Sequence, residues 1–309
     1  MSTLLITHPA CLDHITPSGH PERPDRLRAV ESALESEKFQ SLVRVQAPRA
    51  ELETVALCHP MDYVTQIRDA TPKEGMVRLD ADTSMSPGSF EAALRAVGGA
   101  VHAVDEVVGK KAANAFVATR PPGHHAETAR PMGFCLFDNA AIAARYAQNR
   151  HGIARAAIVD FDVHHGNGSQ EIFWADKTVM YCSTHQMPLF PGTGAVSESG
   201  EFNTVVNAPL RPGDGSQVFR DAFESRVLPR LRDFKPELIV ISAGFDAHMN
   251  DPLANINLIE ADFAWATQKI MDVADRCADG RVVSLLEGGY DLEGLANSAA
   301  AHVTALMHG

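Results

Sequence analysis

Short runs of consecutive apolar residues recur along the chain and predict buried strands. The run 238–242, for example, reads LIVIS and lacks the apolar–polar alternation of a half-exposed strand. Several runs of this kind are continuous, which is typical of parallel strands that helices cover on both faces. The predicted strands comprise residues 3–7, 115–119, 156–161, 179–183, 204–206, 238–242 and 282–286.

Longer segments with helical periodicity separate these strands. They predict helices over residues 90–108, 139–149, 217–234, 260–277 and 292–307. Strands that alternate with helices predict an α/β fold, with a single parallel sheet flanked by helices on both faces. We find no internal repeat, low-complexity segment or Pro/Gly/Ser-rich linker, so we expect one domain over residues 1–309.

The composition suits a globular protein and argues against a nucleic-acid partner. Hydrophobic residues make up 45% and charged residues 21% of the 309 residues, which allows a large packed core. The formal net charge is -12, whereas a nucleic-acid surface needs a basic stripe. Such a charge tolerates cationic partners, for example lysine-rich segments or polyamines.

Cysteine usage and the N-terminus predict a cytoplasmic location. The five cysteines are scattered and form no CxxC pair, which indicates reduced thiols. The N-terminal stretch has no basic region and too short an apolar run for a signal peptide. No apolar stretch is long enough to span a membrane, and the oligomeric state is left open.

Reactive side chains follow four of the predicted strands. In open parallel sheets, ligands bind beyond the carboxyl ends of the strands, so these four segments are expected to meet at one edge. The segments are RPPGHHAE with His124 and His125, DVHHGNG with Asp162 and His164, AGFDAH with Asp246, and EGGYD with Tyr290.

The spacing of Asp162 and His164 indicates a metal site. Residues two apart on extended backbone share a face, so both side chains can bind one ion, with Asp246 as a third ligand. Three protein ligands leave a position open for water or substrate, as in catalytic sites. Two carboxylates and one imidazole suit Zn²⁺, and Fe²⁺, Co²⁺ or Mn²⁺ are alternatives. Otherwise the acids cap loops or pair with Arg120 and Arg155.

Two histidines and a tyrosine supply candidate acid–base groups. His124 and His125 lie on a stiff Pro/Gly loop and form a natural general acid–base pair, although a second metal site or two surface histidines are the alternatives. Asp160 is expected to pair with His124, and His165 to be a packed residue that hydrogen-bonds the backbone. Tyr290 could donate to an oxyanion, or be a half-buried core residue.

Seven segments together resemble the zinc-dependent histone deacetylase superfamily, in particular its class II-like branch of bacterial amidohydrolases. The resemblance implies the arginase–deacetylase fold, an α/β fold with a single parallel eight-stranded sheet between helices. The segments are HPERPDR (20–26), RPPGHHA (120–126), MGFCLFDNAAIAA (132–144), DFDVHHGNG (160–168), PGTG (191–194), SAGFDAHMNDPL (242–253) and EGGYDL (287–292).

The resemblance also implies roles for particular residues. The zinc ligands would be Asp162, His164 and Asp246. The catalytic groups would be His124, His125 and Tyr290, with Asp160 and Asn167 as the hydrogen-bond partners of the two histidines. The acyl-lysine channel would be formed by Gly133, Phe134 and Phe190, with Leu253 at its mouth, and Asp82 would be the loop acid that holds the substrate backbone. A structural potassium ion would bind at Asp160, Asp162, His164, Ser183 and Thr184, mostly through main-chain oxygens.

The chain differs from the class II-like branch at residues expected near the channel entrance. Relatives often read Asp-Thr-Tyr where this chain has Asp82-Thr83-Ser84, so the shape of the channel entrance is open. Polyamine specialists carry an acid where this chain has Leu253.

The expected function is zinc-dependent removal of acetyl groups from acetyl-lysine side chains or similar N-acetylated amines. His125 is the expected base, because an adjacent Asp160 anion would raise the pKa of His124 and keep it charged. Neutral Asn167 would leave His125 free to accept a proton. The alternatives are an acetylpolyamine amidohydrolase and, in another class, an acyl-lysine-binding module without turnover.

Overall fold

An eight-stranded sheet forms the centre of the computed structural model, which describes residues 2–308. All neighbouring strands run parallel, in the order β2-β1-β5-β10-β9-β6-β7-β8. The strands are β1 (Thr3–Thr7), β2 (Val43–Gln46), β5 (Asn114–Val117), β6 (Ala156–Asp160), β7 (Val179–Gln186), β8 (Val205–Leu210), β9 (Leu238–Ala243) and β10 (Val282–Leu286). A small antiparallel pair, β3 (Val77–Arg78) and β4 (Ser84–Met85), lies outside this sheet.

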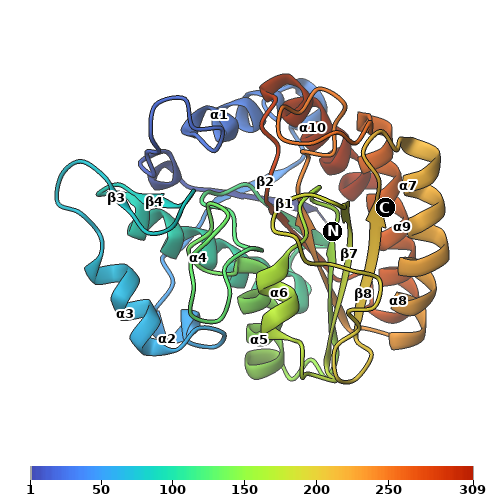
Figure 1. Cartoon of the computed structure of the whole chain (residues 1–309). Helices are drawn as coiled ribbons and strands as arrows, with labels where there is room; N and C mark the ends of the chain where they lie inside the picture. Colours follow the sequence, from blue (N-terminus) through green and yellow to red (C-terminus); the bar gives the residue numbers. More distant parts are fainter. Residues whose placement is uncertain (1, 309) are drawn as a thin grey trace.

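Helices cover both faces of the sheet (Figure 1). One face carries α4 (Ser89–Val108) and α5 (Asn139–His151). The other carries α9 (Glu260–Cys277) and α10 (Leu292–His308), with α1 (Pro24–Ala33), α7 (Ser216–Ala222) and α8 (Leu228–Phe234) beside them. The remaining α-helices are α2 (Leu52–Val55), α3 (Met61–Asp69) and α6 (Asn167–Ile172). The predicted α/β class with a parallel sheet between helices is confirmed.

Side-chain alternation along the strands divides the core into two layers. Leu5 and Phe116 pack on one side of the sheet, whereas Leu4 and Val117 pack on the other. Both layers are buried, which explains why these strands read as continuous apolar runs.

The predicted strands and helices differ from the structure mainly at the edges. Strand β2 reads VRVQ and is largely exposed at one sheet edge, so it lacks the apolar run that marks the inner strands. Strand β8 extends through Pro209, which an edge strand tolerates. The helix expected over 217–234 is present as one continuous helical segment whose middle, Phe223–Val227, is a π-helix. The short helices α1, α2, α3 and α6 were missed.

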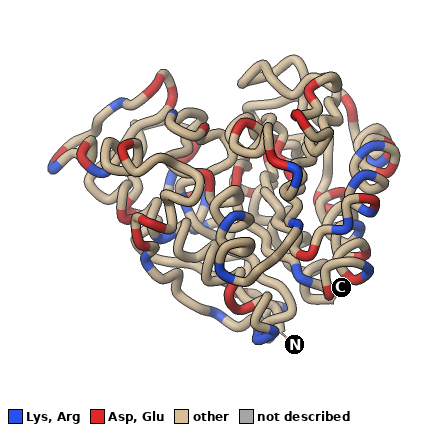
Figure 2. Tube along the Cα trace, turned by 90° about the horizontal axis from the view of Figure 1, so that it is seen from below, with Lys and Arg blue, Asp and Glu red and all other residues tan. Residues whose placement is uncertain are grey.

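Charges are distributed over the molecule. In the view of Figure 2, acidic and basic positions are interspersed along the trace and form no basic stripe. Within residues 2–308, no helix is both long enough and apolar enough to cross a bilayer. One domain over 1–309 stays a prediction, and its end residues Met1 and Gly309 lie outside the described residues.

The strands that precede the reactive segments are adjacent in the sheet. The order β5-β10-β9-β6 places four carboxyl ends side by side. The loops that follow these strands therefore meet above the middle of the sheet, where ligands bind in folds of this type.

Candidate active site

Asp162, His164 and Asp246 come together at the carboxyl ends of β6 and β9. One ligand atom from each lies within 4.8 Å of the others, and all three residues are buried. His164 Nδ1 lies 3.0 Å from Asp246 Oδ2 and 3.3 Å from Asp162 Oδ1. Two buried carboxylates this close to one imidazole need a compensating cation or proton between them. The predicted grouping of these three residues is therefore present.

The backbone around this cluster leaves room for the carboxylates and holds them. A Cβ atom added at Gly244 would lie 2.0 Å from Asp162 Oδ2, and one at Gly288 would lie 2.2 Å from Asp246 Oδ2. The Gly288 N–H donates to Asp162 Oδ2 at 2.7 Å, and the Val163 N–H donates to Asp246 Oδ1 at 2.8 Å. Glycine is required at both positions because of this close approach. The donor set of two carboxylates and one imidazole fits a zinc ion.

The two adjacent histidines lie beside the cluster and have different partners. His124 Nδ1 lies 2.9 Å from Asp160 Oδ2, and His125 Nδ1 lies 2.9 Å from Asn167 Oδ1. The two imidazole ring centroids are 4.0 Å apart. The expected pairing of His124 with Asp160 is thus observed. The suggested alternative partner of the acids, Arg120, instead forms an ion pair with Glu22.

The surroundings push the pKa values of the two histidines in opposite directions. Burial opposes a charge on His124, but the Asp160 and Asp162 carboxylates outweigh it and raise its pKa well above the usual range. Burial and the neighbouring His124 and His164 lower the pKa of His125 well below the usual range. Near neutral pH, His124 is therefore charged and His125 is neutral.

Tyr290 enters the site from the loop after β10, opposite the histidines. Its backbone N–H donates to Asp251 Oδ2 at 2.7 Å, and the Arg26 guanidinium lies 4.8 Å from the centre of its ring. Burial, reinforced by the acids Asp246 and Asp162, raises the pKa of the phenol well above its usual range. The hydroxyl is therefore a proton-bearing donor at neutral pH.

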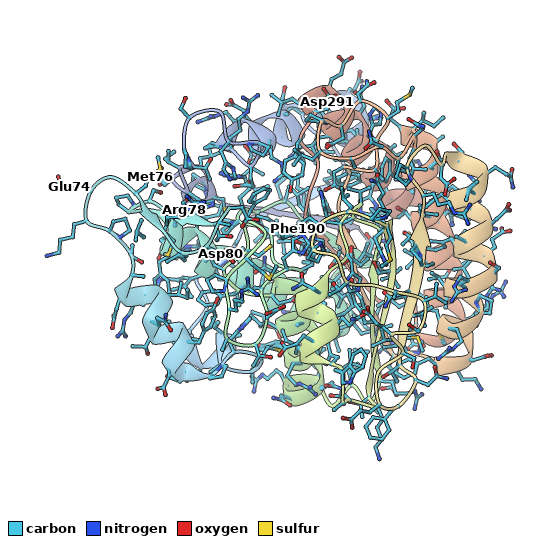
Figure 3. The ribbon with its side chains drawn as sticks, in the orientation of Figure 1. Glu74, Met76, Arg78, Asp80, Phe190 and Asp291 are labelled. Atoms are coloured by element: carbon cyan, nitrogen blue, oxygen red, sulfur yellow. The ribbon has the colours of Figure 1, made fainter. Side chains whose placement is uncertain are left out.

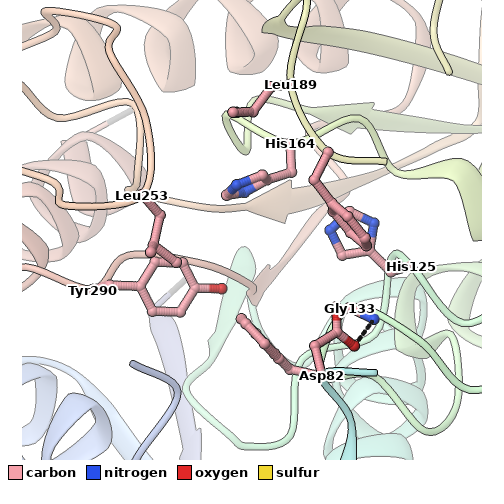
Figure 4. Close-up of a pocket in the computed structure, with 9 residues that line it drawn as sticks. Asp82, His125, Gly133, His164, Leu189, Leu253 and Tyr290 are labelled. Carbon is pink, nitrogen blue, oxygen red and sulfur yellow. Dashed lines mark hydrogen bonds between the residues drawn. The ribbon is translucent and has the colours of Figure 1, made fainter. Parts of the chain in front are cut away.

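His125, His164 and Tyr290 line one pocket with a largely apolar wall (Figure 4). The Tyr290 hydroxyl, His125 and His164 face its interior. The Phe190 ring packs edge-on against His125, with centroids 5.1 Å apart, and Phe134 lies edge-on to Tyr290 at 5.9 Å. The full lining is Asp82, His125, Gly133, Phe134, His164, Leu189, Phe190, Leu253 and Tyr290.

Asp82 and Thr83 hold the backbone of the pocket wall at Gly133 and Phe134. Its Oδ1 accepts a hydrogen bond from the Gly133 N–H at 3.1 Å, and the Thr83 hydroxyl accepts one from the Phe134 N–H at 3.1 Å. Phe134 has a φ of +69°, and these bonds stabilise that left-handed backbone. All five residues predicted to contact the substrate, including Leu253 at the channel mouth, line this pocket.

Comparison with known proteins identifies the family. The model of the histone deacetylase domain matches residues 20–306 of the chain. The chain belongs to the histone deacetylase family. Histone deacetylase 10, chloroplastic, of Oryza sativa is 39% identical, and the match covers 94% of this chain and 70% of that protein. The histone deacetylase-like amidohydrolase of Pseudomonas aeruginosa is also 39% identical, with 88% and 73% covered.

A solved structure agrees with this assignment. The HDA15 HD domain superposes with a TM-score of 0.94 at 34% identity, over 99% of this chain and 88% of that one. The fold is thus the arginase–deacetylase fold of the histone deacetylase family. Membership of the histone deacetylase family supports a deacetylase or amidohydrolase activity on acetylated substrates.

Sequence reasoning missed several groups that hold the histone deacetylase site together. Glu287 is buried, and its Oε2 accepts hydrogen bonds from the backbone N–H groups of Gly123 at 2.7 Å and His124 at 3.2 Å. Burial raises the pKa of its carboxyl to about 8. The Tyr181 hydroxyl donates to Asp160 at 3.0 Å. Glu287 directly follows the apolar run of β10, and this position could have marked it as a buried acid of the site.

One expectation about this region was wrong. His165 does not hydrogen-bond the backbone, because its Nδ1 lies 2.7 Å from the Thr193 hydroxyl and its Nε2 lies 3.0 Å from Gln170 Oε1. The residue is buried, as expected, and both ring nitrogens are satisfied by side chains. His165 therefore belongs to the support of the loop and does not face the pocket.

Proposed function

We propose that this chain is a zinc-dependent amidohydrolase that removes acetyl groups from acetyl-lysine side chains or similar N-acetylated amines. The observation that carries the proposal is that one largely apolar pocket is lined by a member of the metal-binding cluster (His164), one histidine of the adjacent pair (His125) and a tyrosine (Tyr290). Each of these groups has a separate use in amide hydrolysis.

We assign the zinc ion to Asp162, His164 and Asp246. Binding of zinc there would supply a Lewis acid for the amide carbonyl and would acidify the attacking water. The carboxylates are held by backbone N–H groups, so little reorganisation is needed on binding.

His125 is the proposed general base. It is neutral near pH 7, its Nδ1 is held by Asn167, and its ring lines the pocket. His124 remains charged because of Asp160, so it stabilises negative charge that develops on the substrate and cannot accept the first proton. After the amide bond breaks, the proton on His125 passes to the leaving amine.

Tyr290 is the proposed oxyanion donor. Its hydroxyl faces the pocket interior across from His125 and His164. A donor placed where charge develops in the transition state contributes on the order of 10²–10³ to kcat. The phenol keeps its proton at neutral pH because its pKa is raised.

The pocket wall favours an acyl-lysine over a free polyamine. Phe134 and Phe190 provide apolar surfaces for an aliphatic chain, and Leu253 gives the mouth an apolar edge. A polyamine carries a second ammonium group that would need an acid beside Leu253, whereas the carboxylate of Asp82, the one acid among the described residues of the lining, already accepts the Gly133 N–H. The potassium ion that the family resemblance implies at Asp160 and its neighbours stays a prediction.

A panel of substrates tests this proposal. The chain should hydrolyse an acetyl-lysine peptide with a higher kcat/KM than N-acetylputrescine or N-acetylspermidine. A tenfold preference for the polyamines, which corresponds to about 1.4 kcal/mol in transition-state binding, would assign the chain to the acetylpolyamine amidohydrolases instead. Binding of acetyl-lysine without any turnover would favour the non-enzymatic binding module.

A further inference from the structure

A second cavity lies next to the active-site pocket, and Asp82 lines both. Its volume is about 240 Å³. We call it the side cavity. Its other walls include His20, Met76 directly before β3, and Val77, Arg78 and Ser84 of the β3–β4 pair. Figure 3 shows Met76 and Arg78 on the segment that projects from the body of the molecule.

The wall between the pocket and the side cavity is thin and fixed. His20 Nε2 lies 3.2 Å from the Asp82 carbonyl oxygen, and the His20 ring packs edge-on against Phe134, with centroids 4.6 Å apart. The Asp82 side chain bonds the Gly133 N–H on the pocket side. Asp82 thus borders both spaces, and the packed rings of His20 and Phe134 border one space each.

We propose that the side cavity binds an apolar side chain of the peptide residue next to the acyl-lysine. This inference rests on the proposed deacetylase function and deepens it, because it assigns a peptide as the substrate class. Consecutive Cα atoms of a peptide are about 3.8 Å apart, so a neighbouring residue can pass over the rim while the lysine enters the pocket. A small acetylated amine has no group that reaches the side cavity.

The chemistry of the walls determines which neighbour fits. Met76 is 47% exposed and would be partly covered by an apolar side chain, as would Val77. Arg78 donates its Nε–H to the Asp80 carbonyl at 2.8 Å, which holds its cation at the cavity wall. The Asp82 carboxylate lines the same cavity, so its wall carries one charge of each sign and gives no net preference for a charged neighbour. The apolar side chains of Met76 and Val77 therefore favour leucine over a smaller residue such as alanine.

Ser84 keeps the side cavity open. It is the first residue of β4, it lines the cavity, and it is only partly buried. Its side chain is small, whereas an aromatic ring at this position would extend into the space between Met76 and His20. Replacing Ser84 by tyrosine should fill the side cavity without adding charge.

Peptide kinetics with a filled cavity test the inference. Two peptides that differ only in the residue beside acetyl-lysine, namely leucine or alanine, are compared with acetyl-lysine blocked at both ends. For the wild type, we expect the leucine peptide to have a KM about fivefold below that of the alanine peptide, from partial burial of the side chain. Its kcat should be similar, as for binding that is equal in ground and transition state.

The variants decide what causes the preference. Ser84→Tyr should abolish the KM difference between the leucine and alanine peptides. The control is Ser41→Tyr. Ser41 is exposed and precedes the amino end of β2, whereas the pocket lies at the carboxyl ends of the strands, so this variant should keep the KM difference. Met76→Ala should reduce the leucine preference, and it decides the question if Ser84→Tyr does not fold.

The outcomes separate this inference from the function on which it rests. Two results would contradict the proposed role of the side cavity, provided that blocked acetyl-lysine is still hydrolysed. One is equal KM values for the leucine and alanine peptides in the wild type, and the other is a leucine preference that Ser84→Tyr does not remove. Absence of turnover on every acetyl-lysine compound would instead overturn the proposed function, and the inference with it.

Discussion

The floor of the active-site pocket and its rim are built in contrasting ways. The floor comprises Asp160, Asp162, His164 and Asp246 with the two histidines, all buried and hydrogen-bonded to neighbouring groups. The rim comprises Asp82, Phe134, Phe190 and Leu253 on loops, and Phe190 is 40% exposed. Floor positions have little freedom, because a buried charge without its partner is costly. Rim positions can change with little cost to the fold, so we expect them to set substrate preference.

The largest loss of activity is expected from a change in the metal-binding residues on the pocket floor. Asp246→Asn retains an acceptor for the Val163 N–H but is a weaker ligand. Activity should fall on the order of 10³-fold or more, since the metal contributes several kcal/mol to transition-state stabilisation. Zinc content and kcat/KM are measured against Asp233→Asn at an exposed position. A zinc-free variant with full activity would remove the metal from the mechanism.

The next largest effect distinguishes the two histidines. His125→Ala removes the proposed base and should lower kcat by about 10²–10⁴. His124→Ala should reduce kcat less, but it should lower the thermal stability more, because it leaves buried Asp160 without its main partner. His308→Ala, at an exposed position, serves as the control. The reverse order of kcat values would make His124 the base.

A somewhat smaller loss is expected for Tyr290→Phe. This change keeps the ring beside Arg26 and removes the proposed oxyanion donor. We expect kcat to fall on the order of 10²–10³ with an unchanged melting temperature. Tyr146→Phe removes a phenol that bonds Asp105 outside the pocket and should have near-normal kcat. Near-normal kcat for Tyr290→Phe on an acetyl-lysine peptide would reduce Tyr290 to a packing residue.

A rim substitution should change substrate preference and leave the chemistry intact. Leu253→Glu places an anion at the pocket mouth, where it can pair with the distant ammonium of a polyamine. Charge-assisted contacts contribute about 1.5–3 kcal/mol, so kcat/KM should shift toward acetylpolyamines by about tenfold or more. The matched control is Leu253→Gln, which is similar in size and uncharged. An unchanged ratio would show that Leu253 only packs under its loop.

The smallest expected effect is a shift in the pH profile of kcat/KM, caused by a substitution beside the pocket floor. Asn167→Asp adds an anion beside His125 Nδ1 and should raise the pKa of this histidine. Below its pKa, His125 is protonated and cannot accept a proton. The acidic limb of kcat/KM should therefore move to higher pH. Asn149→Asp, an exposed position, should leave the limb in place. A limb that does not move in Asn167→Asp would argue against His125 as the titrating base.

The same contrast explains what could be predicted from the sequence. Inner strands such as β9 lie between two helical layers, so their apolar runs identified them, and the side chains after them gave the members of the floor. Edge strand β2 and the β3–β4 pair have too little apolar content for such a signal. Glu287 was missed because its partners are backbone N–H groups, which sequence patterns do not reveal.

The rim was accessible only through the family resemblance. Asp82 and Gly133 are 51 positions apart, and their hydrogen bond depends on how two loops meet above the sheet. No local sequence pattern predicts that these two loops lie in contact. The side cavity follows from the same packing of distant segments, since His20 precedes α1 and Ser84 belongs to β4.

Zinc-dependent turnover on an acetyl-lysine peptide tests the central claim most directly. The purified chain is stripped of metal with a chelator and dialysed, and kcat/KM is then measured before and after addition of one equivalent of Zn²⁺. We expect the metal-free chain to be inactive and zinc to restore activity in proportion to the zinc bound, whereas Asp246→Asn should not recover. Full activity of the metal-free chain, or a zinc-loaded wild type without hydrolysis, would contradict the account.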